Sequence, residues 1–138
     1  MANKIITETT VNSTLEDVWR KWITPLDIKN WYHASSDWYV PDAESDLRVG
    51  GKFKTVMSAC DKTMGFDFEG TYTEVIEYQK ISYILADNRT IDITFSTEED
   101  GIKIVELFDP ENENPIELQQ AGWQAILDNF KHYVENKK

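Results

Sequence analysis

The sequence predicts an α+β fold, in which a curved antiparallel sheet of about six or seven strands wraps around one long C-terminal helix, with two short helices after the first strand. Three patterns in the chain lead to this prediction. A strand-like segment near the N-terminus is followed by two short helical patterns. Several strand-like segments then follow one another, separated by short turns. The chain ends in a long amphipathic segment, whose apolar stripe is wide enough to cover one face of an antiparallel sheet.

The first strand is predicted over residues 4–11, where β-branched side chains dominate. Ser13 and Glu16 follow with the spacing of a capping box, in which two side chains bind the free backbone N–H groups at the start of a helix. A short helix is therefore expected over about 14–22. Its apolar face is formed by Leu15, Val18, Trp19 and Trp22.

A second short helix begins at Thr24 and Pro25, because threonine caps helices and proline suits the first helical position. This helix is expected to end near Tyr32. Residues 33–51 contain several Gly, Pro and Ser residues, which predict a loop with a short strand at about 38–40. Long loops in small domains are often functional, so a lid over a binding site is one hypothesis for this loop.

Five further strands are predicted, most of them bounded by Gly, Asn or Asp. They cover residues 52–59, 66–77, 80–86, 90–97 and 102–108. Asp100 and Gly101 predict a hairpin turn between the last two strands, because this pair tolerates the positive backbone dihedrals that such turns need.

The long C-terminal helix is predicted over residues 115–136. Asn114 is placed to cap it, and Pro115 suits its first turn. Its apolar stripe has spacings of three, four and seven residues and consists of Ile116, Trp123, Ile126, Leu127, Phe130 and Val134. One glycine, Gly122, lies in the middle of the helix.

Length and composition predict a single domain over residues 1–138, because a chain of this size buries enough surface to fold alone. The formal charge is −11, from 14 Lys and Arg against 25 Asp and Glu. Nucleic-acid binding is therefore not expected, since it needs clustered basic side chains. No segment of about 18 apolar residues is present, so no membrane span is expected either.

The single cysteine, Cys60, permits no internal disulfide and no multi-cysteine metal site. The N-terminal residues 1–6 lack the apolar core of a secretory signal, which predicts a cytoplasmic protein. Gly50 and Gly51 precede a strand, the wrong context for a phosphate loop or a dinucleotide fingerprint. The sequence therefore predicts no cofactor and no metal ion.

Four segments match the motifs of a known family. They are VWRKW at 18–22 with Thr24, Pro25 and Trp31; DLRVGGKF at 46–53; EGTYTEV at 69–75; and Gly122 and Trp123 followed by Leu127 and Phe130. In these segments the chain resembles the activator of Hsp90 ATPase homologue branch of the START-like (SRPBCC) superfamily. The resemblance implies the helix-grip fold, a deep cavity between the long helix and the curved sheet, and a small hydrophobic or amphipathic ligand.

The same resemblance implies a chaperone partner as one hypothesis. The eukaryotic co-chaperone after which the branch is named is similar to this chain only through its C-terminal domain. Its other domain, which makes major chaperone contacts, has no counterpart in these 138 residues. A homodimer also stays open, since no feature of the sequence decides between a monomer and a dimer.

The predicted ligand-binding set combines aromatic and apolar side chains on the sheet, the long helix and the cavity mouth. It consists of Trp31, Trp38, Phe53, Met57, Phe68, Tyr72, Phe95, Glu106, Trp123 and Leu127. Any one of these side chains could instead fill the core. If the set lines a binding site, a cavity of about 300 Å³ or more is expected between helix and sheet.

Glu106 is the one carboxylate in this set. It shares strand parity with Ile102, Ile104 and Phe108, which would turn it inward. Val105 and Leu107 are apolar as well, so the opposite orientation stays open. A buried carboxyl has a raised pKa and can act as an acid, a base or a ligand anchor.

Two functions fit the predicted cavity. The first is binding of a small hydrophobic or amphipathic molecule. The second is an enzyme reaction of the cyclase or hydrolase type, in which Glu106 or His33 acts together with Tyr72. His132 near the end of the last helix is expected to be a surface residue, and Cys60 a passive thiol.

Overall fold

The computed structural model describes residues 4–33 and 35–136. Residues 1–3, on which part of the interpretation of the N-terminus rests, lie outside this range. Along the chain the elements are β1 (Ile5–Val11), α1 (Leu15–Ile23), α2 (Pro25–Trp31), β2 (Trp38–Ser45), β3 (Lys52–Ala59), β4 (Gly65–Ile76), β5 (Lys80–Leu85), β6 (Thr90–Glu98), β7 (Gly101–Phe108) and α3 (Ile116–Asn136). Most predicted boundaries agree with these to within one residue.

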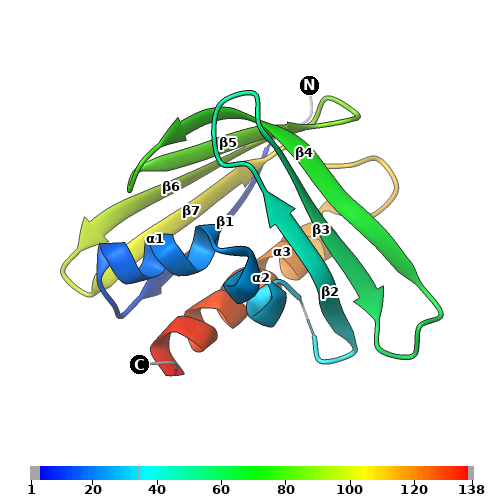
Figure 1. Ribbon diagram of the computed structural model, residues 1–138, viewed down its shortest axis with the longest axis horizontal. Coiled ribbons are helices and arrows are strands. Elements are labelled where there is room, and N and C mark those ends of the chain that lie inside the picture. Colours follow the sequence, from blue (N-terminus) through cyan, green and yellow to red (C-terminus); the bar gives the residue numbers. More distant parts are fainter. Residues whose placement is uncertain (1–3, 34, 137–138) are drawn as a thin grey trace.

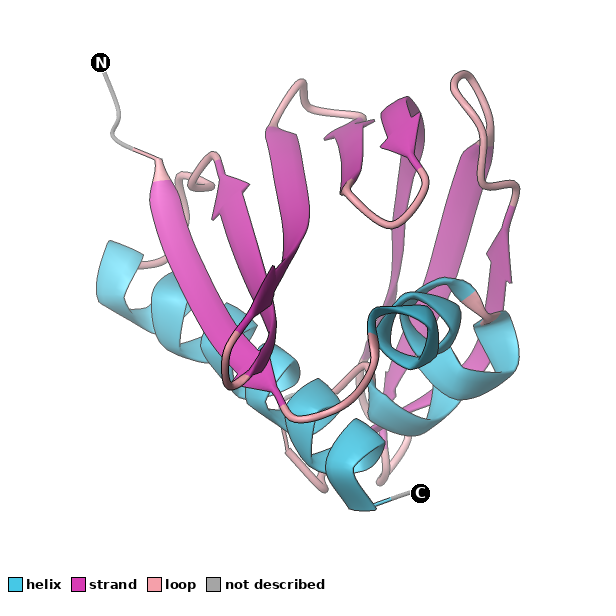
Figure 2. Cartoon of the chain, turned by 90° about the vertical axis from the view of Figure 1, so that its left-hand side faces the viewer, coloured by secondary structure: helices cyan, strands magenta, loops and turns pink. Residues whose placement is uncertain are grey.

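The strands form one seven-stranded sheet in the order β1-β7-β6-β5-β4-β3-β2, and every neighbouring pair is antiparallel. The strands from β2 to β7 follow one another along the chain, and β1 joins the far edge by pairing with β7. The sheet curls, and the three helices lie together along one side of it (Figures 1 and 2). The predicted α+β arrangement, with two short helices after the first strand, is confirmed.

The predicted cap of α1 is wrong by one residue. Thr14, not Ser13, is the N-cap, and its hydroxyl accepts a hydrogen bond from the backbone N–H of Asp17 at 3.1 Å. The Ser13 hydroxyl donates instead to the Asp17 carboxylate at 2.7 Å. Ser13 and Thr14 are both good caps, so the choice between them depends on where the chain leaves β1.

The segment 33–51, predicted as a loop with a short strand at about 38–40, contains an eight-residue strand, β2, which begins at Trp38 as predicted but continues to Ser45. Pro41 and Asp42 suggested a break in regular structure, but β2 lies at the edge of the sheet, where proline is tolerated. The pairing of β2 with β3 shifts register between Tyr39 and Asp42, which accommodates the proline. The lid hypothesis for the whole loop is thereby restricted to the short segments on either side of β2.

Helix α3 covers the free edge of β1, which pairs with β7 on its other side. Gln120 donates to the carbonyl of Ile6 at 3.0 Å, and Lys131 donates to the carbonyl of Thr10 at 2.6 Å. The side-chain amide of Gln124 also binds the backbone of β1, at Glu8. These contacts satisfy backbone groups that an open edge would leave unpaired, and they fix α3 against the sheet.

An aromatic cluster joins the three helices. The ring centroids of Trp22, Trp31 and Phe130 lie between 4.6 and 4.9 Å apart. The indole N–H of Trp31 donates to the backbone carbonyl of Lys21 at 3.1 Å. This carbonyl would normally bind the N–H four residues later, but that residue is Pro25, which has none. Trp31 therefore holds the corner between α1 and α2 in place.

The turn between β6 and β7 requires glycine at position 101. Gly101 pairs with Glu98 and has a φ of +139°, in the region that L side chains rarely adopt. An added Cβ would lie 2.1 Å from the backbone oxygen of Val11. Glu99 and Asp100 are the two central residues of the turn, and the predicted hairpin is confirmed.

We expect Gly101→Ala to destabilise the fold by roughly 2 kcal/mol or more, because it combines backbone strain with a clash against β1. Equilibrium urea denaturation followed by circular dichroism measures this change. Gly122→Ala is the matched control: an added Cβ there meets nothing within 4 Å, and alanine favours a helix over glycine by up to about 1 kcal/mol. Equal effects at both positions would contradict this account of Gly101.

Candidate functional site

A small cavity lies between the two short helices and the sheet. We call it the inner cavity, and its volume is about 50 Å³. It is lined by Trp22, Ile23, Ile28, Trp31, Tyr32, Glu44, Ser45, Leu47, Phe53, Thr55, Phe68, Tyr72, Ile81, Tyr83, Ile93 and Glu106. Its volume is well below the expected 300 Å³ and suffices only for a few water molecules.

Glu106 turns inward on β7 and is only 6% exposed. Its Oε1 accepts a hydrogen bond from the hydroxyl of Thr7 on β1 at 2.8 Å. No described residue donates a hydrogen bond to its other oxygen. Burial raises the pKa of Glu106 to about 7, and the hydrogen bond from Thr7 acts weakly in the opposite direction. At neutral pH this carboxyl is close to half protonated, so it can donate or accept a proton.

Three tyrosines join Glu106 in the inner cavity. The hydroxyl of Tyr72 shares a hydrogen bond with that of Ser45 at 2.7 Å. The hydroxyls of Tyr32 and Tyr83 interact with each other, and the negative charge of Glu106 contributes to raising the pKa of both. Burial raises the pKa of all three tyrosines above its ordinary value, so they stay protonated at neutral pH. The inner cavity is therefore lined by aromatic rings together with a buried carboxyl and several hydroxyl groups.

A second hollow lies between α3 and the strands β3 and β4. We call it the outer groove; it is open to solvent, and its volume is about 330 Å³. It is lined by Tyr32, Met57, Phe66, Phe68, Arg89, Glu111, Asn114, Leu118, Gln119, Gly122, Trp123 and Ile126. The outer groove exceeds 300 Å³ but is an open groove, and the inner cavity does not reach the volume expected of a cavity between the long helix and the sheet.

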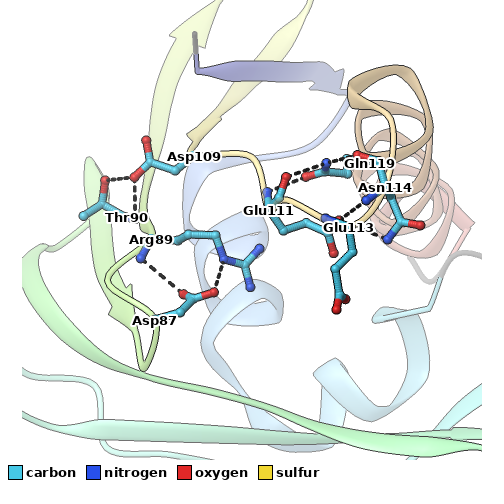
Figure 3. A network of polar contacts seen from close by, with 8 residues as sticks. All are labelled: Asp87, Arg89, Thr90, Asp109, Glu111, Glu113, Asn114 and Gln119. Carbon is cyan, nitrogen blue, oxygen red and sulfur yellow. Dashed lines mark hydrogen bonds and ion pairs between the residues drawn. The ribbon is translucent and has the colours of Figure 1, made fainter. Parts of the chain in front are cut away.

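One end of the outer groove is held by a polar network between the β5–β6 turn and the segment before α3 (Figure 3). Arg89 donates to Asp87 at 2.7 Å. The carboxylate of Glu111 accepts hydrogen bonds from the backbone N–H of Asn114 at 2.7 Å and from the side-chain amide of Asn114. The backbone N–H of Glu111 donates to the side-chain oxygen of Gln119 at 2.8 Å. Asn114 thus binds Glu111 through its side chain, where the sequence predicted a helix cap. The network fixes the start of α3 beside the groove.

Two aromatic side chains separate the two hollows. Tyr32 and Phe68 line both of them. Their rings are stacked, with centroids 6.0 Å apart and an interplanar angle of 27°. Tyr32 is the C-cap residue of α2, and Phe68 lies on β4.

The structure brings seven of the ten predicted site residues to these hollows. Trp31, Phe53, Phe68, Tyr72 and Glu106 line the inner cavity, and Met57, Phe68 and Trp123 line the outer groove. The other three, Trp38, Phe95 and Leu127, line neither hollow. Trp38 packs on Phe66, Phe95 packs against Trp19 and Trp22, and Leu127 is buried in the core.

Sequence reasoning missed the two tyrosines, Tyr32 and Tyr83, whose hydroxyls interact electrostatically with Glu106. Tyr83 follows the alternation of Ile81 and Leu85 on β5, so strand parity could have placed it inward. Tyr32 could not have been found this way, because its position depends on where α2 ends. The indole of Trp22 also lines the inner cavity, although its helical spacing indicated only a core position.

The other chemical candidates lie apart from both hollows. His33 lines neither of them; burial lowers its pKa, and its Nδ1 is buried without a hydrogen-bond partner. Cys60 is exposed, and so is His132. Within residues 4–33 and 35–136, no group of three or more His, Cys, Asp or Glu side chains is arranged to hold a metal ion. The groups in the inner cavity that can take part in chemistry are the buried carboxyl of Glu106 and the tyrosine hydroxyls.

The sequence matches the family model described as "Activator of Hsp90 ATPase homolog 1-like protein" over residues 12–135. The chain therefore belongs to the AHSA1-like family. This is a START-like family with the helix-grip fold, as the resemblance implied. No curated protein is significantly similar in sequence. No helix among the described residues of this AHSA1-like protein is long and apolar enough to span a membrane.

Several solved structures are similar along nearly the whole chain. An AHSA1-like protein from Aeromonas hydrophila is 43% identical, with a TM-score of 0.91 over 97% of this chain and 93% of that one. A protein from Cytophaga hutchinsonii is 49% identical, with a TM-score of 0.85 over 98% of this chain and 94% of that one. A protein from Chromobacterium violaceum shares the fold at 24% identity, with a TM-score of 0.84 over 96% and 97% of the two chains.

Proposed function

We propose that this AHSA1-like protein binds a small hydrophobic or amphipathic molecule between α3, the short helices and the sheet. The observation that carries the proposal is Glu106, a buried carboxyl with one oxygen unpartnered, in a cavity whose other walls are mainly aromatic and aliphatic. The second oxygen faces the cavity, where it can bind a polar group of a ligand, and ligand sites typically combine mainly apolar walls with a few such polar groups. The outer groove adds the space that the inner cavity lacks.

A second candidate function is an enzyme reaction of the cyclase or hydrolase type in the inner cavity. The pKa of Glu106, raised to about 7 by burial, favours it, because an acid or base works best when its pKa lies near the ambient pH. Tyr72 lines the same cavity and can donate a hydrogen bond to a substrate. His33 is not part of this candidate, since it lines neither hollow.

We place either function in the cytoplasm, supported by the single, free Cys60. An Hsp90-type chaperone partner has only the family description in its favour. An ATPase assay with such a chaperone tests it: no stimulation would remove this alternative. Size-exclusion chromatography with light scattering tests for a homodimer.

The binding proposal predicts an extra mass on the gently purified protein in native mass spectrometry, absent after denaturation and identifiable by extraction. Leu118→Asp should reduce its occupancy at least about tenfold, because it adds a charge to the apolar lining of the outer groove. Ile116→Asp is the matched control. Both side chains are exposed, at 59% and 48%, and both lie in the first turn of α3, but Ile116 lines neither hollow.

If the wild-type protein carries no extra mass and no extract of its cells changes its melting temperature, the binding proposal fails. Equal loss of the ligand in Leu118→Asp and Ile116→Asp would place the ligand outside the outer groove. Turnover of the extracted molecule, abolished by Glu106→Gln, would favour the enzyme reaction instead.

A further inference from the structure

The inner cavity and the outer groove share two lining side chains. Tyr32 and Phe68 line both hollows and stack on each other between them. Neither residue is fully buried. Rotation of Tyr32 breaks the contact of its hydroxyl with Tyr83 but no hydrogen bond of the sheet backbone, so this partition can open without unfolding any element.

The backbone around Tyr32 allows such a movement. Tyr32 follows the last residue of α2 and has a φ of −81° and a ψ of 65°, outside the helical region. Trp31 just before it is anchored, because its indole binds Lys21 and its carbonyl accepts a hydrogen bond from Asn129 on α3 at 2.8 Å. The backbone N–H of Tyr32 still donates to the carbonyl of Ile28 at 3.0 Å, so opening of the partition is a movement of the Tyr32 side chain and not of α2.

The two hollows have complementary chemistry. The polar groups that line the inner cavity include the carboxyl of Glu106, whose Oε2 accepts no hydrogen bond from a described residue, and the hydroxyl of Tyr83. The outer groove is lined mainly by apolar side chains from α3, β3 and β4. A molecule that spans both would need one polar end and an apolar body.

Gly122 supports a ligand in the outer groove. Glycine in the middle of a helix costs stability, and an added Cβ here would meet nothing within 4 Å, so packing does not require it. Because Gly122 has no side chain, open space is left along the outer groove beside Trp123. This space lets a ligand lie directly against α3.

From these observations we infer that the two hollows form one elongated binding site, interrupted by Tyr32 and Phe68, and that its ligand is an amphipath with an uncharged hydrogen-bonding end. The uncharged end lies at Glu106, and the apolar body passes the partition into the outer groove. A carboxylate end is disfavoured, because Glu106 and Glu44 both line the inner cavity. The inference rests on the proposed binding function and specifies its ligand.

The test uses two probes of equal length, decan-1-ol and decanoate, because the combined space suits a chain of roughly ten carbon atoms. Binding at pH 8 is followed by tryptophan fluorescence, since Trp31 and Trp123 line the two hollows. We expect one molecule of decan-1-ol per chain, bound at least about tenfold more tightly than decanoate. Glu106→Gln should bring the two affinities to within about threefold of each other, because it removes the charge that repels the acid.

Gly122→Leu should weaken decan-1-ol binding at least about tenfold without lowering the stability of the fold, because leucine fills the groove and favours the helix. Ile116→Asp is the control and should bind as the wild type does. Tyr32→Ala should speed association at least about tenfold by removing the partition. Phe68→Leu opens the same partition from β4, and Tyr39→Ala, an exposed tyrosine that lines neither hollow, is its control.

If Gly122→Leu leaves decan-1-ol affinity unchanged, the apolar body of the ligand does not lie in the outer groove beside α3. If Glu106→Gln leaves the alcohol-to-acid ratio unchanged, the polar end does not lie at Glu106. If both Tyr32→Ala and Phe68→Leu leave the association rate unchanged, Tyr32 and Phe68 do not obstruct entry of the ligand. Each of these results overturns the inference while the binding function stands. A wild type that binds neither probe but carries another ligand in native mass spectrometry also overturns the inference alone. A bare wild type that binds neither probe overturns the binding function as well.

Discussion

Glu106→Gln is expected to abolish a loss of stability that the wild-type protein undergoes as the pH rises from about 4.5 to about 7. The pKa of Glu106 is 4.5 when fully solvated and about 7 in the fold, where burial raises it. Below pH 4.5 the carboxyl is protonated in both states. Between the two values the unfolded chain releases the proton and the folded chain keeps it, so the free energy of unfolding falls. Above pH 7 both states are ionised, and the difference stays constant.

The full change corresponds to roughly 3 kcal/mol, from about 1.4 kcal/mol for each pH unit between the two pKa values. The protein carries a sequence isoelectric point near 4.5, so measurements are best made between pH 5.5 and 8. Over this range the stability difference between wild type and Glu106→Gln should change by roughly 2 kcal/mol in favour of the variant. Urea denaturation of both proteins at the two pH values measures it.

Glutamine is the suitable replacement because its amide oxygen can still accept the hydrogen bond from Thr7. The other acidic groups titrate in both proteins, so their contributions cancel in the difference. A stability difference that does not change between pH 5.5 and 8 would show that Glu106 keeps an ordinary pKa in the folded protein. It would also remove the half-protonated acid on which the enzyme alternative depends.

Trp31→Ala is expected to have the largest effect of any single substitution proposed for this protein, about 4 kcal/mol. Trp31 is 1% exposed, and its ring contacts Trp22 and Phe130, so its removal leaves a cavity between all three helices. Chemical denaturation followed by far-ultraviolet circular dichroism measures the loss.

Trp31→Phe separates packing from hydrogen bonding. It keeps an aromatic ring but leaves the Lys21 carbonyl without the indole N–H, and we expect a loss of about 2 kcal/mol. Trp123→Phe is the comparison. Trp123 stacks on Phe108 at 3.8 Å but is only partly buried, and no hydrogen bond of its indole within the described residues is lost. If Trp31→Phe costs no more than Trp123→Phe, the hydrogen bond to Lys21 contributes nothing to stability.

The elements of the fold could be predicted from local patterns, because alternation and helical spacing are properties of short segments. The stripe containing Phe130 and Val134 predicted α3, and both residues are fully buried. Local patterns failed where tertiary position decides. Pro41 is compatible with β2 only because this strand lies at an edge of the sheet, which the sequence does not reveal.

The candidate site could be predicted only in part, for a similar reason. Glu106 has apolar residues on both sides of its strand, so alternation alone could not orient it. Its inward position is decided by the pairing of β7 with β1, which brings Thr7 to its carboxyl. The contact of Tyr32 with Phe68 joins the end of a helix to a strand far along the chain, and no local pattern encodes such a contact.

The position of β1 has a consequence for synthesis of the chain. The strands from β2 to β7 can pair in turn as each emerges from the ribosome, because each pairs with the strand before it. Of the seven strands β1 is made first, but its partner β7 is made last. Ile5 can pair with Phe108 only after about a hundred further residues have been added to the chain. During that interval β7 is absent and α3, which covers the other edge of β1, has not been made. Between the synthesis of β1 and that of β7 the nascent chain therefore carries an unpaired strand, and pairing of β1 with β7 completes the sheet.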